Sequence, residues 1–160
     1  MRRTFQLLSA LAAMVALNPA AEPALGFAAV VHPNNPARDL RLRELASLFE
    51  GMNRQWPNHS PVILVERDSG SAPYRYLMLH LLNTTAVEYK RSLRNVEYRG
   101  EAPVPVKVLN SDAAACQFVY NVPTAIAIVE ARSLSTQACA VVQVVRIEGK
   151  LPSEEGYRLK

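Results

Sequence analysis

The stretch Val62-Ile63-Leu64-Val65-Glu66-Arg67-Asp68-Ser69-Gly70-Ser71-Ala72-Pro73-Tyr74-Arg75-Tyr76-Leu77 joins an apolar run, a Gly/Ser loop and the start of a helix. The run is short and rich in β-branched residues, which predicts a buried strand. Pro73 suits the first turn of a helix, because the N–H that proline lacks has no partner there in any case. A strand that passes through a tight loop into a helix is the repeating unit of layered α/β domains.

The loop inside this stretch has the chemistry of a small-anion site. The free N–H groups of a helix start and the positive end of the helix dipole both favour an oxyanion. The guanidinium of Arg67 offers two parallel donors, and Gly70 lets a ligand approach the backbone closely. Ser71 offers a hydroxyl and an amide. The predicted ligand-binding residues are Arg67, Asp68, Ser69, Gly70 and Ser71, with Asp68 orienting Arg67. The competing interpretation is a surface ion pair at Arg67 and an ordinary helix cap at Ser71.

The rest of the chain alternates short apolar runs with amphipathic segments. Strands are predicted at residues 27–32, 62–66, 106–109, 125–129 and 139–147, and helices at 42–49, 73–82, 86–93 and 112–120. Such alternation predicts an α/β single layered domain with a mostly parallel sheet flanked by helices. The helix at 42–49 has a weak start, because Arg41 stands where Ser or Thr would complete a capping box with Glu44.

The first residues have the pattern of a secretory signal peptide. Arg2 and Arg3 precede an apolar core at 5–17, and small residues with proline follow. We expect cleavage between Ala21 and Ala28, which gives a signal peptide at 1–26 and a domain at 27–160. No later segment is long and apolar enough to cross a bilayer. The sequence therefore predicts a periplasmic or secreted protein that is not an integral membrane protein.

Composition excludes several kinds of partner. The chain has 18 basic and 14 acidic residues, for a formal net charge of +4. Two of the cations leave with the signal peptide, so the excess is too small for nucleic-acid binding and is compatible with a small anion. No cofactor motif occurs, and the histidines and cysteines lack metal-ligand spacing, so no metal site is predicted. Cys116 and Cys139 form either a disulfide or two buried thiols.

Several segments together resemble a known family. They are residues 29–36, 45–51, 56–62, 66–71, 98–103, 121–129, 147–152 and 157–159, in this order. The chain resembles the phosphate ABC transporter substrate-binding family, a type II periplasmic-binding-protein fold, and it matches one lobe alone. The resemblance implies phosphate or another small oxyanion as ligand, and an ABC permease or envelope sensor protein as partner. The family has Gly and Thr where this chain has Ala72 and Pro73. One backbone donor and one hydroxyl are therefore missing, and we expect weak binding.

Two other functions compete with solute binding. Ser71, His80 and Asp112 are the residue types of a hydrolase triad, but the G-x-S-x-G spacing of a nucleophile elbow is absent. We therefore expect no enzymatic activity. The second alternative is an interaction or scaffold module of the cell envelope that binds no small ligand.

Overall fold

The computed structural model describes residues 26–98 and 101–160. The predicted signal peptide lies outside these residues, apart from Gly26, and it stays a prediction. The strands are β1 (Phe27–Val31), β2 (Asp39–Leu40), β3 (Ile63–Arg67), β4 (Val106–Leu109), β5 (Ala125–Glu130), β6 (Gln143–Val144) and β7 (Arg146–Ile147). The α-helices are α1 (Leu42–Phe49), α2 (Ala72–Tyr76), α3 (Ala86–Tyr98) and α4 (Asp112–Asn121). The π-helical turn η1 (Leu77–Leu81) continues α2, and the 3-10 turn η2 (Ala131–Ser135) follows β5.

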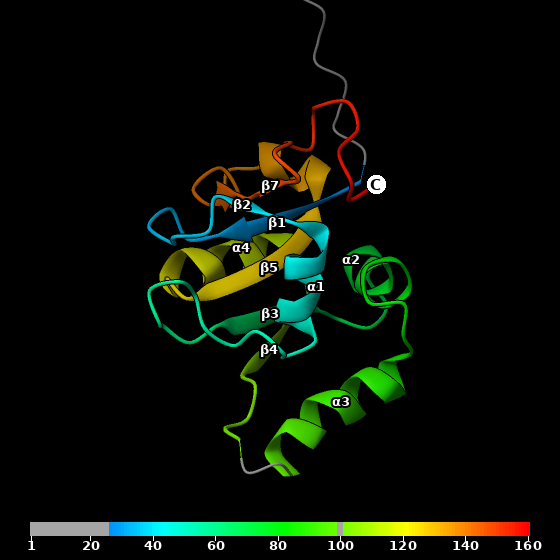
Figure 1. The fold of residues 1–160 in the computed structure, drawn as a ribbon. Helices are drawn as coiled ribbons and strands as arrows, with labels where there is room; N and C mark the ends of the chain where they lie inside the picture. The colour runs from blue at the N-terminus through cyan, green and yellow to red at the C-terminus, as the bar shows by residue number, and fades with distance from the viewer. Residues whose placement is uncertain (1–25, 99–100) are drawn as a thin grey trace, which may run out of the picture.

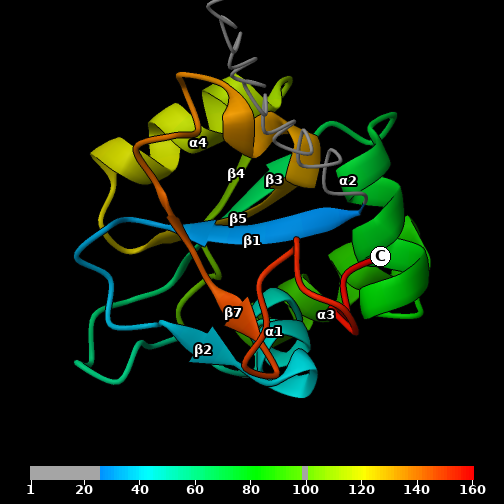
Figure 2. The same ribbon diagram turned by 90° about the horizontal axis from the view of Figure 1, so that it is seen from above.

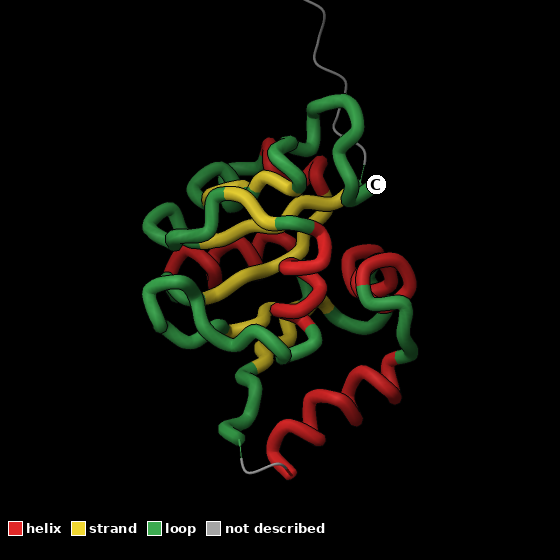
Figure 3. Tube along the Cα trace, in the orientation of Figure 1, coloured by secondary structure: helices red, strands yellow, loops and turns green. Residues whose placement is uncertain are grey.

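The central sheet has the strand order β4-β3-β5-β1-β6 (Figure 1). β3 is parallel to both β4 and β5, whereas β1 is antiparallel to β5 and to β6. Four of the five strands therefore run in one direction, and β1 alone opposes them. Helices lie against both faces of this sheet (Figure 3). The predicted fold class, an α/β domain with a mostly parallel sheet flanked by helices, is confirmed.

Alternation along the strands gives the sheet two apolar faces. In β3, Leu64 contributes to the core beneath α1 and α2, and its neighbour Val65 contributes to the core beneath α4. Both side chains are almost fully buried. Figure 2 shows the result, with α4 on one side of the sheet and α1 and α3 on the other. A strand that is covered on both faces explains the continuous apolar run at its start.

The weak start of α1 is completed from elsewhere in the chain. The Arg41 amide donates to Glu44 at 2.7 Å, which is half of a capping box. The Leu42 amide donates to the carboxylate of Glu148 at 3.0 Å, across 106 positions of sequence. The missing cap residue is thus replaced by a distant carboxylate, which also favours the positive end of the helix.

The predicted strand at 139–147 is wrong in extent. Only β6 and β7 are extended there; β6 pairs with β1, and β7 pairs with β2 in a separate two-stranded sheet. Residues 136–142 form turns, and Cys139 in these turns is joined to Cys116 of α4 by a disulfide. Both cysteines are buried. The bridge therefore ties the turns to α4, and the interpretation as two free thiols is excluded.

No helix in the described residues combines the length and the apolar character that a membrane crossing needs.

Candidate functional site

The predicted loop at 67–71 lies between two neighbouring strands whose following helices cover opposite faces of the sheet. β3 ends at Arg67, which is in register with Leu109 at the end of β4. α2 follows β3 on one face of the sheet, and α4 follows β4 on the other face. Adjacent parallel strands whose helices leave to opposite faces form a topological switch point, where open α/β sheets bind their ligands. The loop at 67–71 therefore lies at a topological switch point, the position where ligands of open α/β sheets are generally found.

Arg67 is held by the protein itself. Its Nη1 donates to the carboxylate of Asp112 at the start of α4. Its Nε donates to the Leu109 carbonyl at 3.3 Å, and its Nη2 donates to the Asn110 carbonyl at 3.1 Å. Nη2 also donates to the Asp68 carboxylate at 3.4 Å. Each guanidinium nitrogen thus has a partner, and a ligand would have to share Arg67 with Asp112.

The sequence did not predict Asp112 as the partner of Arg67. Its second carboxylate oxygen accepts from the Glu130 amide at 3.0 Å and from the Ser133 hydroxyl at 2.6 Å. The side chains of Arg67 and Asp112 are only 11% and 9% exposed. One carboxylate therefore joins the ends of β3 and β5 and the starts of α4 and η2. A signal was present in the sequence, because Asp112 follows the next predicted strand, and the carboxyl ends of parallel strands share one edge.

Ser71 acts as the cap of α2. Its hydroxyl donates to the Asp68 carbonyl at 2.7 Å and accepts from the Tyr74 amide at 3.3 Å. The Arg75 guanidinium donates to the Gly70 carbonyl at 2.7 Å, which closes the loop from the other side. The helix-cap interpretation of Ser71 is confirmed by these contacts. Its predicted role toward a ligand is not tested by them.

The loop keeps donors that no residue of the described ranges uses. The backbone amides of Ser69, Gly70 and Ala72 have no hydrogen-bond partner among the described residues. Ser69 and Gly70 are exposed. These amides stand at the start of α2, where the helix dipole favours negative charge. The loop can therefore offer three backbone donors to an anion without disturbing the ion pair beneath it.

The residues of the hydrolase alternative do not meet through any contact in the described structure. Ser71 binds within its own loop, and Asp112 binds Arg67 and the end of β5. The ring of His80 stacks on Tyr76, with 5.4 Å between the ring centroids. A triad requires hydrogen bonds from nucleophile to base and from base to acid, which these contacts do not supply. Across residues 26–98 and 101–160, no group of three or more His, Cys, Asp or Glu could hold a metal ion.

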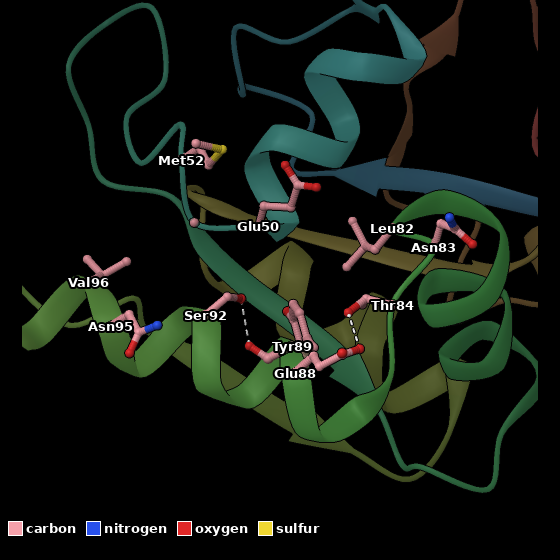
Figure 4. A pocket seen from close by; sticks show the side chains of 11 residues that line it. Glu50, Met52, Leu82, Asn83, Thr84, Glu88, Tyr89, Ser92, Asn95 and Val96 are labelled. Atoms are coloured by element: carbon pink, nitrogen blue, oxygen red, sulfur yellow. Dashed lines mark hydrogen bonds between the residues drawn. The ribbon is translucent and has the colours of Figure 1, made fainter.

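A hollow of about 450 Å³ lies between the end of α1 and α3 (Figure 4), and no residue of the 67–71 loop lines it. Glu50, Glu88 and several neutral polar side chains line it. Hydrogen bonds from the Thr85 hydroxyl and amide hold the pKa of Glu88 below its usual value. Glu88 is therefore a carboxylate at neutral pH and repels negative charge. This hollow does not suit an oxyanion.

Comparison with known proteins supports the fold. No family model matches the chain, and no curated protein matches it. Among solved structures, it is similar to PstS from Borrelia burgdorferi, with a TM-score of 0.65 and 14% identity over 84% of this chain and 54% of that one. It is also similar to an ABC-type phosphate transport receptor from Vibrio cholerae, with a TM-score of 0.60 and 19% identity over 80% of this chain and 48% of that one. The chain spans about half the length of these structures, so its fold is that of one lobe of a periplasmic-binding-protein-like protein.

Proposed function

We propose that this chain is an exported, non-enzymatic solute-binding module whose 67–71 loop binds phosphate or a similar oxyanion weakly. The observation that carries the proposal is the placement of the Ser69, Gly70 and Ala72 amides, which have no partner among residues 26–98 and 101–160, at the switch point of the sheet. The similarity to solved phosphate receptors supports the same ligand class. The module would act in the periplasm with an ABC permease or an envelope sensor protein.

Magnitudes support weak binding. Charge-assisted hydrogen bonds contribute about 1.5–3 kcal/mol each, so a few of them give roughly 5–8 kcal/mol. Association costs at least about 4 kcal/mol of lost freedom, and the remainder corresponds to millimolar affinity. Arg67 adds little, because Asp112 and Asp68 balance its charge. We infer that tight binding needs further hydrogen-bond donors to the anion, supplied by a partner surface or by a second copy of this chain.

A second function, an interaction module that binds no small ligand, is favoured by one observation. The guanidinium of Arg67 and the hydroxyl of Ser71 already serve the fold itself. An envelope partner would then recognise the domain through its surface. The two functions differ in their response to free anions.

The Gly70→Ala variant is expected to lose anion binding while keeping its stability. A Cβ at Gly70 would contact only the Asp68 carboxylate, at 3.6 Å, and the backbone of Gly70 has no positive φ. The folded protein therefore tolerates alanine, whereas an anion on the loop amides meets the added methyl group. Calorimetric titration with phosphate and sulfate into the millimolar range measures binding, and thermal unfolding measures stability.

Ser71→Ala and Thr85→Ala form a matched pair of controls for this experiment. Both variants lose a serine or threonine helix cap, at a cost of about 1 kcal/mol, but Thr85 lies at the start of α3. Only Ser71→Ala should weaken the anion signal. An absence of heat from the wild-type protein with both anions would reject solute binding and favour the interaction module. Unchanged binding in Gly70→Ala would reject the loop as the site.

A further inference from the structure

A second hollow, which we call the β4 groove, lies between α3 and the outer strand β4. Its volume is about 410 Å³, within the range of small-molecule sites. The walls are apolar and come from Val104, Val106 and Val108 on one side and Leu93 of α3 on the other. Val108 is 57% exposed, although it belongs to the central sheet. The groove therefore presents apolar surface that the described residues leave uncovered.

Glu66 of β3 lines this apolar groove. Only 6% of the residue is exposed, and the Tyr89 hydroxyl donates to its Oε1 at 2.6 Å. Its other carboxylate oxygen has no hydrogen-bond partner among the described residues. Because the only fully buried side-chain polar atom without a partner in the described residues is the Tyr157 hydroxyl, this Glu66 oxygen is accessible from the groove. A donor that enters the groove can therefore reach it.

Two cations of α3 complete the lining. Lys90 and Arg94 are one helical turn apart and border the same groove. A ligand that is only cationic would be attracted by Glu66 and repelled by these two side chains. A ligand that is only anionic would be attracted by these two side chains and repelled by Glu66. The arrangement matches a molecule that carries both charges and an apolar body.

We propose that the β4 groove binds a small zwitterion with an apolar side chain, such as an apolar α-amino acid. Its ammonium group would donate to the open oxygen of Glu66, and its carboxylate would accept from Lys90 and Arg94. The apolar side chain would pack on Val106 and Val108. No residue that lines this groove belongs to the 67–71 loop, so the proposal stands independently of oxyanion binding.

The titration of Glu66 agrees with this geometry. Burial raises the pKa of Glu66, while the Tyr89 hydrogen bond and the charge of Lys90 act in the opposite direction. The groups that face it are Tyr89 and Lys90 of α3 and Tyr74 of α2, with Arg94 farther along the groove. Because an ammonium group prefers the ionised carboxylate, affinity should rise as pH increases through this raised pKa.

Glu66 also gives stability a pH dependence. The folded protein holds this proton more tightly than the unfolded chain does, because burial raises the pKa in the fold. Stability is therefore expected to fall as pH rises from the usual glutamate range through the raised pKa. The Glu66→Gln variant should lack this decline. Denaturant unfolding at several pH values tests both, and an equal decline in the two proteins would contradict it.

The binding experiment uses L-leucine, N-acetyl-leucine and leucine methyl ester with the wild-type protein. Leucine should bind and shift the methyl resonances of Val104, Val106 and Val108 in NMR spectra. The acetylated compound lacks the ammonium group and the ester lacks the carboxylate, so each should bind at least about tenfold more weakly. No binding of leucine, or equal binding of N-acetyl-leucine, would overturn the proposal.

Variants locate the site. Glu66→Gln keeps an acceptor for Tyr89 and removes a buried charge, so the protein should fold and leucine affinity should fall at least about tenfold. Arg94→Gln should also weaken binding, whereas Arg91→Gln, a matched change at an exposed position outside the groove lining, should leave it unchanged. An unchanged affinity in Glu66→Gln, or an equal loss in Arg91→Gln, would reject the groove as the site.

Discussion

The Asp112→Ala variant is expected to lose about 3–5 kcal/mol of its free energy of unfolding. Removing one partner of a buried ion pair leaves the other charge buried without compensation, which costs this much. Among the described residues, Arg67 would be left with only the exposed Asp68 as a carboxylate partner. The Glu130 amide and the Ser133 hydroxyl would lose their acceptor at the same time. A domain stabilised by roughly 5–15 kcal/mol would become marginal, which chemical denaturation measures directly.

Asp68→Ala is the matched control, because Asp68 pairs with the same guanidinium. Its side chain is 47% exposed, so its loss should cost less than about 1 kcal/mol. The double variant Arg67→Ala/Asp112→Ala should be more stable than the sum of the single effects predicts, because it removes both buried charges. If Asp112→Ala were no less stable than Asp68→Ala, the Arg67–Asp112 ion pair would not be a main source of stability at this end of the sheet. An Arg67→Ala variant by itself is a poor probe of anion binding for the same reason.

Removal of the disulfide is the second large effect. Cys116 and Cys139 are 23 positions apart, and a loop of this length corresponds to about 3 kcal/mol of chain entropy in the unfolded state. The paired variant Cys116→Ala/Cys139→Ala should therefore unfold at a clearly lower denaturant concentration.

Reduction of the wild-type protein offers an independent measurement of the same effect. A reductant should lower the stability of the wild-type protein to about that of the paired variant and leave the variant itself unchanged. A paired variant as stable as the oxidised wild-type protein would show that the bridge contributes nothing beyond packing.

Local pattern was sufficient for most of the fold. The apolar runs that became β3 and β5 and the amphipathic segment of α1 carry their own periodicity, so their positions followed from the sequence alone. The segment at 139–147 did not, although it is equally β-branched. Its two short strands pair with different sheets, and the almost fully buried Val145 lies between them. This division depends on distant partners that no local pattern contains.

The same limit applies to the candidate site. The loop and its Ser71 cap were found from the sequence, because both are local features. The pairing of Arg67 with Asp112 spans 45 positions and was not found. The burial of Glu66 could have been predicted from the sequence. Glu66 stands two positions after Leu64, so strand alternation turns both side chains to the same covered face. An acidic residue at a covered position of a strand is unusual and indicates a special role.

The last residues of the chain complete the start of its first strand. The Phe27 amide donates to the Leu159 carbonyl at 2.7 Å, and both Tyr157 and Leu159 are buried. The two ends of the domain are therefore joined by a backbone hydrogen bond and by shared core packing. Proteolytic removal of this tail, or an affinity tag fused close behind it, would disturb both the start of β1 and the core that Tyr157 and Leu159 help to form.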